Sequence, residues 1–426
     1  AKINAVLDTA GSLFEGAALI GSAGGDINFT MTNDALWKMT DDSSVTKLAL
    51  SGGAVVDMSQ HDAYQQLDVA ELSGSGGEFI MKTDLASETD GDKVYIKDAA
   101  AGTSQLVQVA DVSLSSGMVV TGEKKLLLIT DASKNATFVG KKLNEGGLWD
   151  VTPTIENGLA IGESEEEWYL TNLRKGVNND TEVLLNASDN SYALWRNTND
   201  SLRSRLGALG NGSERADGIW ARTQAGRFSG FGYEGRYNLY QLGYDQKADA
   251  KSTYGLAVDY GDGTGDYTDG SGKDKLTAFS FYGVWQGKRG AYTNVTARAG
   301  MFDTDLKSYG DFPDKASYKE HAYSISVEYG QRFDLQQGLF FEPQAQFIMG
   351  RLSSSSYTTD RGNHVYMSGV NSYIGRLGFV LGQKTSENND VYFKANLLHE
   401  FGGDRDIYMR AANGETLSDN RDYGDT

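Results

Sequence analysis

The sequence lacks most of the residues from which soluble enzymes build reactive centres. It has no cysteine, which excludes disulfide frameworks, thiolate zinc sites and cysteine nucleophiles. Its four histidines are scattered along the chain and leave little for a metal cluster. The motifs Gly-x-Ser-x-Gly, His-Glu-x-x-His and the P-loop are also missing. The sequence therefore predicts no enzyme activity, no metal site and no cofactor.

Basic residues and long apolar runs are also scarce. The chain has 39 Lys and Arg against 58 Asp and Glu, a net charge of −19, which argues against a nucleic-acid partner. The longest strongly apolar stretch, around Leu126–Ile129, is far shorter than the roughly 20 residues of a membrane helix. Three prolines and 52 glycines among 426 residues favour extended β structure in two or three units. No signal peptide opens the chain at Ala1, so we expect either a mature fragment or an internal piece of a longer chain.

Short β-prone segments recur along the first part of the chain. They are Ile27–Met31, Ala35–Met39, Ser44–Leu50 and Ala54–Met58, and longer ones follow from Leu67 to about Leu173. Strands this short cannot bury a face alone, but stacked rungs of a parallel β-solenoid cover one another. A β-sandwich remains the alternative.

Two acidic clusters are candidates for cation sites. The Glu163–Glu167 cluster is explained more simply as a solvated loop or edge. Residues 262–270 have the composition of a calcium loop but lack the spacing and the closing Glu of an EF-hand. We therefore expect an acidic exposed loop there.

One helix is predicted between two β regions, over Asp189–Leu209. Its apolar stripe is formed at three- and four-residue steps by Leu194, Thr198, Leu202, Leu206 and Leu209. Asp189 or Ser191 is expected to cap its start, and Gly207 and Gly210 weaken and end it.

After Gly218 the apolar residues alternate strictly with polar or small ones. In Tyr323–Gln331 the apolar parity is Tyr323, Ile325, Val327 and Tyr329, and Leu339–Met349 and Tyr373–Leu381 repeat the pattern. A period of two indicates strands with one apolar and one polar face. Nine such segments are predicted: Gly218–Phe228, Gly235–Asp245, Ser252–Gly261, Lys275–Gln286, Ala291–Met301, His321–Gln331, Gly338–Met349, Asn371–Gly382 and Asp390–Phe401.

The length of these segments favours a membrane barrel over a soluble sheet. Soluble strands are mostly about 5–6 residues long, whereas membrane strands need about 9–11. Short connections such as Gly287–Gly290 alternate with the long polar ones Asp262–Asp274, Phe302–Glu320 and Arg351–His364. Short turns on one rim and long loops on the other are typical of outer-membrane barrels. A soluble lipocalin-like barrel, with its apolar parity inside, stays open as an alternative.

A barrel with its polar parity inside would have an acidic lumen, and the preceding helix carries arginines. We expect the helix to thread this lumen, where Arg–carboxylate pairs would hold it. A surface helix with solvated arginines is the alternative. The predicted contacts between the helix and the lumen are Arg196, Arg203, Arg205, Asp259, Glu328, Glu342, Gln344 and Gln346.

Several motifs, in the order in which they occur along the chain, resemble those of a known protein family. Around the helix they are Leu194-Trp195-Arg196, Leu202-Arg203, Arg205-Leu206-Gly207 and Gly218-Ile219-Trp220-Ala221-Arg222; in the strands they are Tyr240–Asp245, Phe341–Gln346, Gly375-Arg376-Leu377-Gly378 and Leu397–Phe401. Over residues 190–401 the chain resembles a classical (type Va) autotransporter. Upstream, Leu48–Asp57 and Leu67–Leu85 resemble the last rungs and the autochaperone region of a pertactin-like passenger.

This resemblance implies an all-β fold: the end of a right-handed parallel β-solenoid, then a pore helix and an antiparallel outer-membrane β-barrel. It divides the chain into residues 1–66 (last passenger rungs), 67–174 (autochaperone and cap), 175–215 (linker and pore helix) and 216–426 (barrel). The implied function is secretion of the chain's own passenger to the cell surface. The implied partners are outer-membrane lipid, periplasmic chaperones and the barrel-assembly machinery.

Two departures from the family pattern matter. The family barrel has twelve strands, so nine strands followed by a loop-like stretch, Gly402–Thr426, imply a chain cut before the last three. We then expect the first and ninth strands to pair with another protein, such as the assembly machinery holding a stalled substrate, or to have exposed edges. The helix has Asn197-Thr198-Asn199 where some relatives cleave between adjacent asparagines, so autocleavage is not predicted. A cell-surface adhesin and a porin-like channel remain alternative functions.

Overall fold

The chain forms two compact units in a computed structural model. The structure describes residues 1–22, 24–113, 124–143, 146–210, 217–386 and 389–424. One unit comprises residues 1–145 and 149–177, and the other comprises residues 146–148 and 178–426. Each unit is described by itself.

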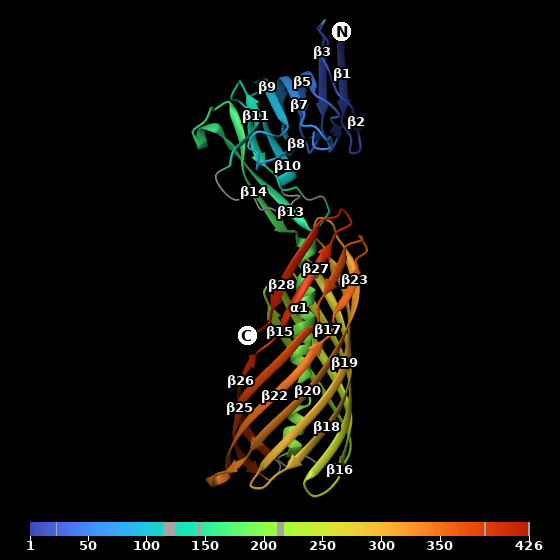
Figure 1. The fold of residues 1–426 in the computed structure, drawn as a ribbon, viewed down its shortest axis with the longest axis vertical. Helices are drawn as coiled ribbons and strands as arrows, with labels where there is room; N and C mark the ends of the chain where they lie inside the picture. The colour runs from blue at the N-terminus through green and yellow to red at the C-terminus, as the bar shows by residue number, and fades with distance from the viewer. Residues whose placement is uncertain (23, 114–123, 144–145, 211–216, 387–388, 425–426) are drawn as a thin grey trace. The chain divides into compact units, whose positions relative to one another are not determined.

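The first unit is a parallel β-solenoid built from two sheets (Figure 1). From β1 to β13 successive strands alternate between the sheets, which have the orders β1-β3-β5-β7-β9-β11-β14-β13 and β12-β10-β8-β6-β4-β2. Parallel pairing, as between β1 and β3, excludes the β-sandwich alternative. The strands are β1 (Lys2–Leu7), β2 (Leu13–Glu15), β3 (Asp26–Met31), β4 (Leu36–Lys38), β5 (Ser43–Leu50), β6 (Val55–Asp57), β7 (Gln66–Ser73), β8 (Ser75–Thr83), β9 (Lys93–Ala99), β10 (Ser104–Asp111), β11 (Leu126–Asp131), β12 (Thr137–Gly140), β13 (Trp149–Asn157) and β14 (Glu167–Val177).

The last two strands of this unit depart from the predicted rungs. β13 and β14 pair antiparallel, and β14 also pairs antiparallel with β11. The chain reverses direction through the 3₁₀-helix Gly158–Ile161, which Asn157 caps. The unit therefore ends in a hairpin. The glutamates at its turn pair with lysines, as Glu163 does with Lys125, which agrees with a solvated edge.

The solenoid interior is mostly apolar, and a few polar side chains are buried in it. Phe29 and Trp37 stack there at 4.7 Å between ring centroids. Gln105 is completely buried, and its Nε2 donates to the carbonyl oxygens of Leu50 (3.0 Å) and Gly74 (2.9 Å). Its Oε1 accepts from the backbone N–H of Gly77 at 2.8 Å. One side chain thus satisfies backbone groups from separate turns of the chain.

The second unit contains an open antiparallel sheet of nine successive long strands (Figure 1). Its order follows the sequence, and β21 (Phe333–Asp334) pairs with β22 off this path. Among the described residues, β15 and β26 each have one neighbour in this sheet. The nine strands are β15 (Gly218–Gly230), β16 (Tyr233–Lys247), β17 (Ser252–Tyr267), β18 (Gly270–Gln286), β19 (Ala291–Ser308), β20 (Lys315–Gln331), β22 (Leu339–Leu352), β25 (Val370–Ser386) and β26 (Asn389–Glu400).

The predicted long loops were largely wrong, because most of their residues continue the strands. Residues 262–267 belong to β17 and 270–274 to β18, so the calcium-like segment is a hairpin tip. Residues 302–308 and 315–320 likewise extend β19 and β20. These extensions looked like loops because both of their faces carry polar residues.

The stretch from Gly402 onward was also predicted wrongly as loop-like. It contains β27 (Asp404–Arg410) and β28 (Thr416–Asp422), which form a four-stranded sheet with β23 (Ser355–Thr358) and β24 (His364–Met367) in the order β23-β24-β27-β28. Like β25 and β26, β24 and β27 pair antiparallel.

The helix begins ten residues earlier than predicted. α1 runs over Asn179–Asn199 and α2 over Arg203–Gly210. Asn178, rather than Asp189 or Ser191, caps α1 by accepting from the backbone N–H of Thr181 at 2.8 Å. Asp180 and Glu182 lie in the first turn, where carboxylates favour the helix N-terminus. No described helix is long and apolar enough to cross a membrane.

We expect Gln105→Leu to destabilise the solenoid by about 3 kcal/mol, because it removes the side-chain partner of the Leu50 carbonyl oxygen and of the buried Gly77 N–H, and one of the two donors to the Gly74 carbonyl oxygen. Gln66→Leu is the matched control, because the Gln66 side chain is exposed and bonds only to the Asp68 side chain. The urea midpoint for proteolytic cleavage within residues 1–177 of the intact chain measures the difference. Equal midpoints for the two variants would contradict the role given to Gln105.

Candidate functional site: the helix inside the barrel

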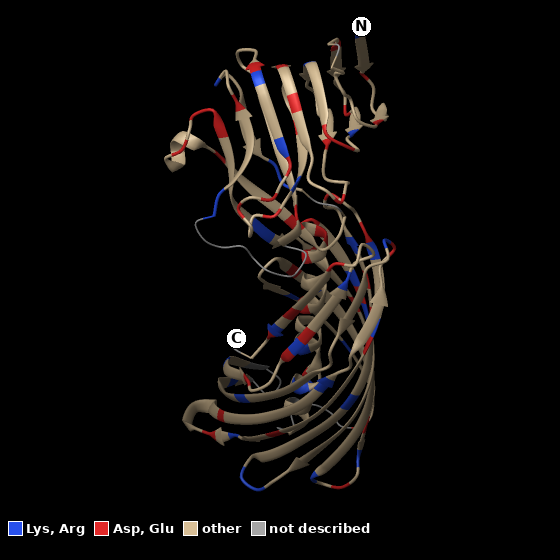
Figure 2. Cartoon of the chain, turned by 45° about the horizontal axis from the view of Figure 1, so that its top comes forward, with Lys and Arg blue, Asp and Glu red and all other residues tan. Residues whose placement is uncertain are grey.

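The outward face of the long strands is apolar along its middle. Phe341, Phe347 and Leu377 are 38%, 46% and 65% exposed, so the apolar parity faces outward as predicted. On β20 the outward row begins at Tyr323 and ends at Tyr329, with Ile325 and Val327 between them. Figure 2 shows charged residues sparse along the middle of these strands and denser toward their ends. An apolar band bounded by tyrosines fits a lipid-facing surface with interfacial aromatic girdles.

The inward face packs against the helices. Leu194 and Trp195 lie in a buried cluster with Leu239, Leu276, Phe302 and Leu352. Further along, Leu202, Leu206 and Leu209 pack with Trp220, Tyr282 and Val284. A Cβ on Gly350 would lie 2.5 Å from the Trp195 ring, so only glycine leaves room for this ring. The predicted apolar stripe of the helix therefore faces the barrel wall.

Arg298 on β19 joins the barrel wall to the end of α1. Its guanidinium forms an ion pair with Asp259 on β17 at 2.9 Å, and both side chains are buried. It also donates to the Thr198 carbonyl oxygen and, at 2.8 Å, to the Ser201 hydroxyl. A cation at a helix C-terminus satisfies carbonyl groups that have no partner within the helix. The predicted lumen residue Asp259 thus acts through a barrel arginine that the sequence reasoning missed.

Arg205 holds α2 against the wall, as expected, but through a different carboxylate. Its Nε lies 3.0 Å from Oδ2 of Asp245 on β16, and both groups are buried. Asp245 also accepts from the Trp220 indole N–H at 3.1 Å and from the Tyr282 hydroxyl. The Arg205 guanidinium lies over the Trp220 ring, 5.6 Å from its centroid.

Four of the other predicted lumen residues form one network within the wall. Arg376 on β25 pairs with Glu328, and its guanidinium donates to Gln346 at 2.7 Å and to Gln344 at 3.2 Å. Glu342 accepts from the Tyr292 hydroxyl at 2.7 Å. Among the described residues, the network is hydrogen-bonded to the helix segment where Gln346 donates to Asp200 Oδ1 at 2.9 Å.

The remaining two arginines do not pair with the wall. Arg203 lies 3.4 Å from Asp200 in its own segment, and both side chains are about one quarter exposed. Arg196 is half-buried, and no described carboxylate lies within ion-pairing distance of it. Of the three helix arginines, only Arg205 forms the predicted kind of contact.

Sequence reasoning missed the contacts around the first half of α1. Asn190 donates to Asp274 at 3.0 Å, and Tyr192 donates to Glu400 at 2.9 Å. Arg405, fully buried, pairs with Glu320 and donates to Ser188 at 2.9 Å. The sequence does contain a signal for these contacts, because polar residues such as Asp274 and Glu320 continue the alternation of the strands. These two residues were predicted to lie in loops instead.

These observations define a class of protein. Long antiparallel strands with an apolar outer band and a polar inner face filled by a helix are the architecture of a membrane β-barrel with a plugged lumen. The described residues include no group of three or more His, Cys, Asp or Glu arranged to hold a metal ion.

Two family models match the chain. The autotransporter β-domain matches residues 215–426, and pertactin matches residues 45–172. The chain belongs to the autotransporter family. Its β-domain is the translocator, and its first unit is the stem of the passenger. The protein lies in the bacterial outer membrane, and its passenger part is exposed at the cell surface.

Curated relatives match nearly the whole chain at low identity. The serine protease pet autotransporter of Escherichia coli is 26% identical over 394 residues, covering 90% of this chain and 29% of that protein. The BrkA autotransporter of Bordetella pertussis is 27% identical over 393 residues, covering 88% and 37%. The pertactin autotransporter of Bordetella parapertussis is 25% identical over 441 residues, covering 87% and 46%. The chain thus spans less than half the length of these relatives.

Solved structures of autotransporter domains are also similar. The β-domain of the Bordetella autotransporter BrkA matches at a TM-score of 0.41 and 24% identity, covering 48% of this chain and 90% of that one. The translocator domain of NalP from Neisseria meningitidis matches at a TM-score of 0.39 and 14% identity, covering 53% and 90%.

We expect Arg298→Met to lower the stability of the second unit by about 3–5 kcal/mol, because it leaves Asp259 buried without its cation. Arg203→Met, which removes a pair that is about one quarter exposed, should cost less than about 1 kcal/mol. Adding Asp259→Asn to Arg298→Met should recover part of the loss. The readout is the temperature at which the folded gel mobility in detergent is lost. Equal losses from the two single variants would contradict this account of the helix contact.

Proposed function

We propose that the barrel delivers its own passenger across the outer membrane and then anchors it, with the helix left in the lumen. The observation that carries this proposal is the set of buried contacts between helix and wall, from Asn190 in the middle of α1 to Arg205 in α2. A segment that connects the passenger to the first strand and fills the lumen is expected of a chain that crossed there. A porin-like channel is less well supported, because the helix occupies the space that solutes would use.

The four predicted segments acquire roles in this proposal. Residues 1–66 are the last rungs of the passenger, and residues 67–174 act as the autochaperone and cap. Residues 175–215 are the linker and pore helix, of which 211–215 lie outside the described residues, and residues 216–426 form the barrel. Folding of the cap on the far side would bias transport without ATP, because each added rung buries a new neighbour interface.

No enzymatic step is needed for this function. Some relatives are named serine proteases, but the similarity to them covers less than a third of their length. We propose that the present chain is the non-catalytic stem and translocator. No described feature favours an adhesin role over it.

Insertion requires partners of a particular kind. Lipid cannot satisfy the backbone groups of a strand that has not yet paired with its neighbours. We propose that the barrel-assembly machinery pairs the long strands during insertion and that periplasmic chaperones keep them unpaired until then.

Protease added to intact cells should remove an epitope placed upstream of residue 170 and spare residues 218–401. The stem is accessible outside the cell, whereas the barrel is protected by lipid. Immunoblots against each part measure the two outcomes. Protection of both parts until the outer membrane is permeabilised would overturn the proposed topology.

Ile129→Asp should lower the surface level of the passenger several-fold if its folding drives export, because Ile129 is fully buried in β11. Val139→Asp on β12 adds the same charge at a side chain that is 52% exposed, and should have little effect. Accessibility of the passenger to added protease, normalised to the amount of folded barrel, measures the surface level of each variant. If the two variants reach the surface equally, folding of this region does not drive export.

A further inference from the structure

The outward face of the barrel changes character beyond the tyrosine that ends the apolar band on β16 and β17. Tyr240 and Tyr260 are direct cross-strand partners in that row. Beyond them, the strands carry two rows of outward polar side chains, which we call the collar. Its first row is Asn238, Asp262, Lys275, Asp303 and Lys319, and its second row is Arg227, Arg236, Thr264, Lys273 and Asp305.

In the first row of the collar, the acidic and basic side chains neutralise each other's charge. Acidic and basic residues alternate from β17 to β20, so each charge lies opposite one of the other sign. Lys319 and Asp303 form an ion pair at 2.9 Å, and Asn238 donates to Asp262 at 3.2 Å. Opposite charges on neighbouring strands stabilise a sheet. This row has little charge left for an external ligand.

The second row begins with two arginines directly opposite each other. Arg227 on β15 and Arg236 on β16 are register partners, and both side chains are exposed. Like charges in such a pair, about 5 Å apart at Cβ, repel each other. Arg236 has only a loose contact with Asp266, at 3.7 Å, and no described carboxylate lies within 4 Å of Arg227. Within the part of the chain that the structure describes, this arginine pair is therefore undercompensated.

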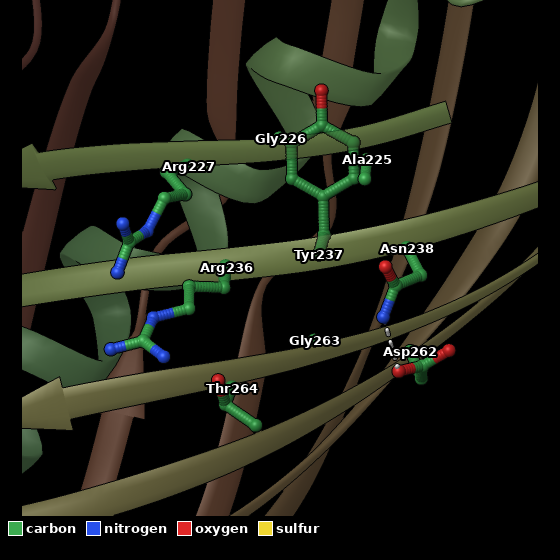
Figure 3. A pocket seen from close by; sticks show the side chains of 9 residues that line it. All are labelled: Ala225, Gly226, Arg227, Arg236, Tyr237, Asn238, Asp262, Gly263 and Thr264. Atoms are coloured by element: carbon green, nitrogen blue, oxygen red, sulfur yellow. Dashed lines mark hydrogen bonds between the residues drawn. The ribbon is translucent and has the colours of Figure 1, made fainter.

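The two arginines line a hollow in the surface and provide N–H donors to one side of it (Figure 3). Figure 3 shows both guanidinium groups extending to the same side, while Asp262 is turned toward Asn238. Thr264, the register partner of Arg236, adds a hydroxyl, and the hollow has a volume of about 490 Å³. Paired guanidinium groups bind phosphate oxygens through parallel N–H donors, and bound phosphate would relieve the repulsion between them.

The position of the hollow selects the source of the phosphate. Arg236 lies four residues beyond Tyr240, about 13 Å along the strand, and the tilt of the strand reduces its height above the girdle. That is the depth of lipid headgroups rather than of acyl chains or bulk solvent. The neighbouring turn contacts α1 through Asn186 and Gly232, near the end of α1 that leads to the passenger. The site therefore faces the outer leaflet.

We propose that Arg227 and Arg236, with Thr264, bind the phosphomonoester of a lipid headgroup in the outer leaflet. The proposal uses the membrane placement of the barrel and is independent of passenger transport. Headgroup binding at this edge would fix the height and tilt of β15 and β16 in the bilayer.

The test uses the intact chain in nanodiscs of phosphatidylcholine with and without phosphatidate, whose headgroup is a phosphomonoester. Native mass spectrometry counts retained phosphatidate. Arg227→Gln/Arg236→Gln should weaken retention at least about tenfold, because two charge-assisted bidentate contacts are lost. Lys307→Gln/Lys315→Gln is the matched control: it removes two charges from another directly opposed pair on the same rim, but lysine cannot form a fork. Unchanged gel mobility of both variants establishes that their barrels are folded.

Each other outcome would overturn the proposal. Equal loss in both double variants would mean diffuse attraction to the rim. Retention unaffected by the arginine changes would place the lipid elsewhere. Inorganic pyrophosphate that competes with phosphatidate, and binds as tightly without a bilayer, would make the site one for free anions rather than for lipid.

Discussion

Inside lipid, every polar group must find its partner within the protein, and this constraint governs the second unit. A strand with one apolar face turned to acyl chains necessarily turns its other face inward. Asp245, Asp259 and Glu328 lie on that inner face and are buried. Without guanidinium partners they would be uncompensated charges in a medium of low dielectric constant. The arrangement of helix and wall follows from this need.

The helix provides only some of the cationic partners for the buried carboxylates, and the strands of the wall provide the others. Arg205 is the one helix arginine that meets a wall carboxylate. Arg298 and Arg376 are contributed by strands, and Arg298 bonds both to Asp259 and to the carbonyl groups at the end of α1. The helix is thus held through its backbone as well as its side chains. Such a plug resists displacement, which suits a stem that must stay attached to the cell surface.

The orientation of the strands could be predicted from the sequence, because the parity of residues such as Phe341 and Leu377 directly reports which face meets lipid. The ends of the strands could not, because beyond the girdle the outer face becomes polar, as at Asp262, and the inner face mixes polar with apolar residues, as at Asp274 and Leu306. The start of α1 was missed because five of the six buried residues from Asn186 to Ser191 are polar, which interrupts the apolar stripe that would otherwise connect Leu194 with Val183 and Leu184. The carboxylate that pairs with Arg205 is determined by the register of the strands, and neither composition nor alternation predicts register.

The side of the sheet that faces lipid can be measured directly, because the chain has no cysteine of its own. Neighbouring residues on β18 provide the pair: Phe281 is half-exposed on the outer face, and Ser280 is fully buried on the inner one. A fluorophore placed through Phe281→Cys should be quenched strongly by brominated acyl chains, and one placed through Ser280→Cys should not. Quenching at Ser280 together with none at Phe281 would mean that the barrel is turned inside out relative to this account.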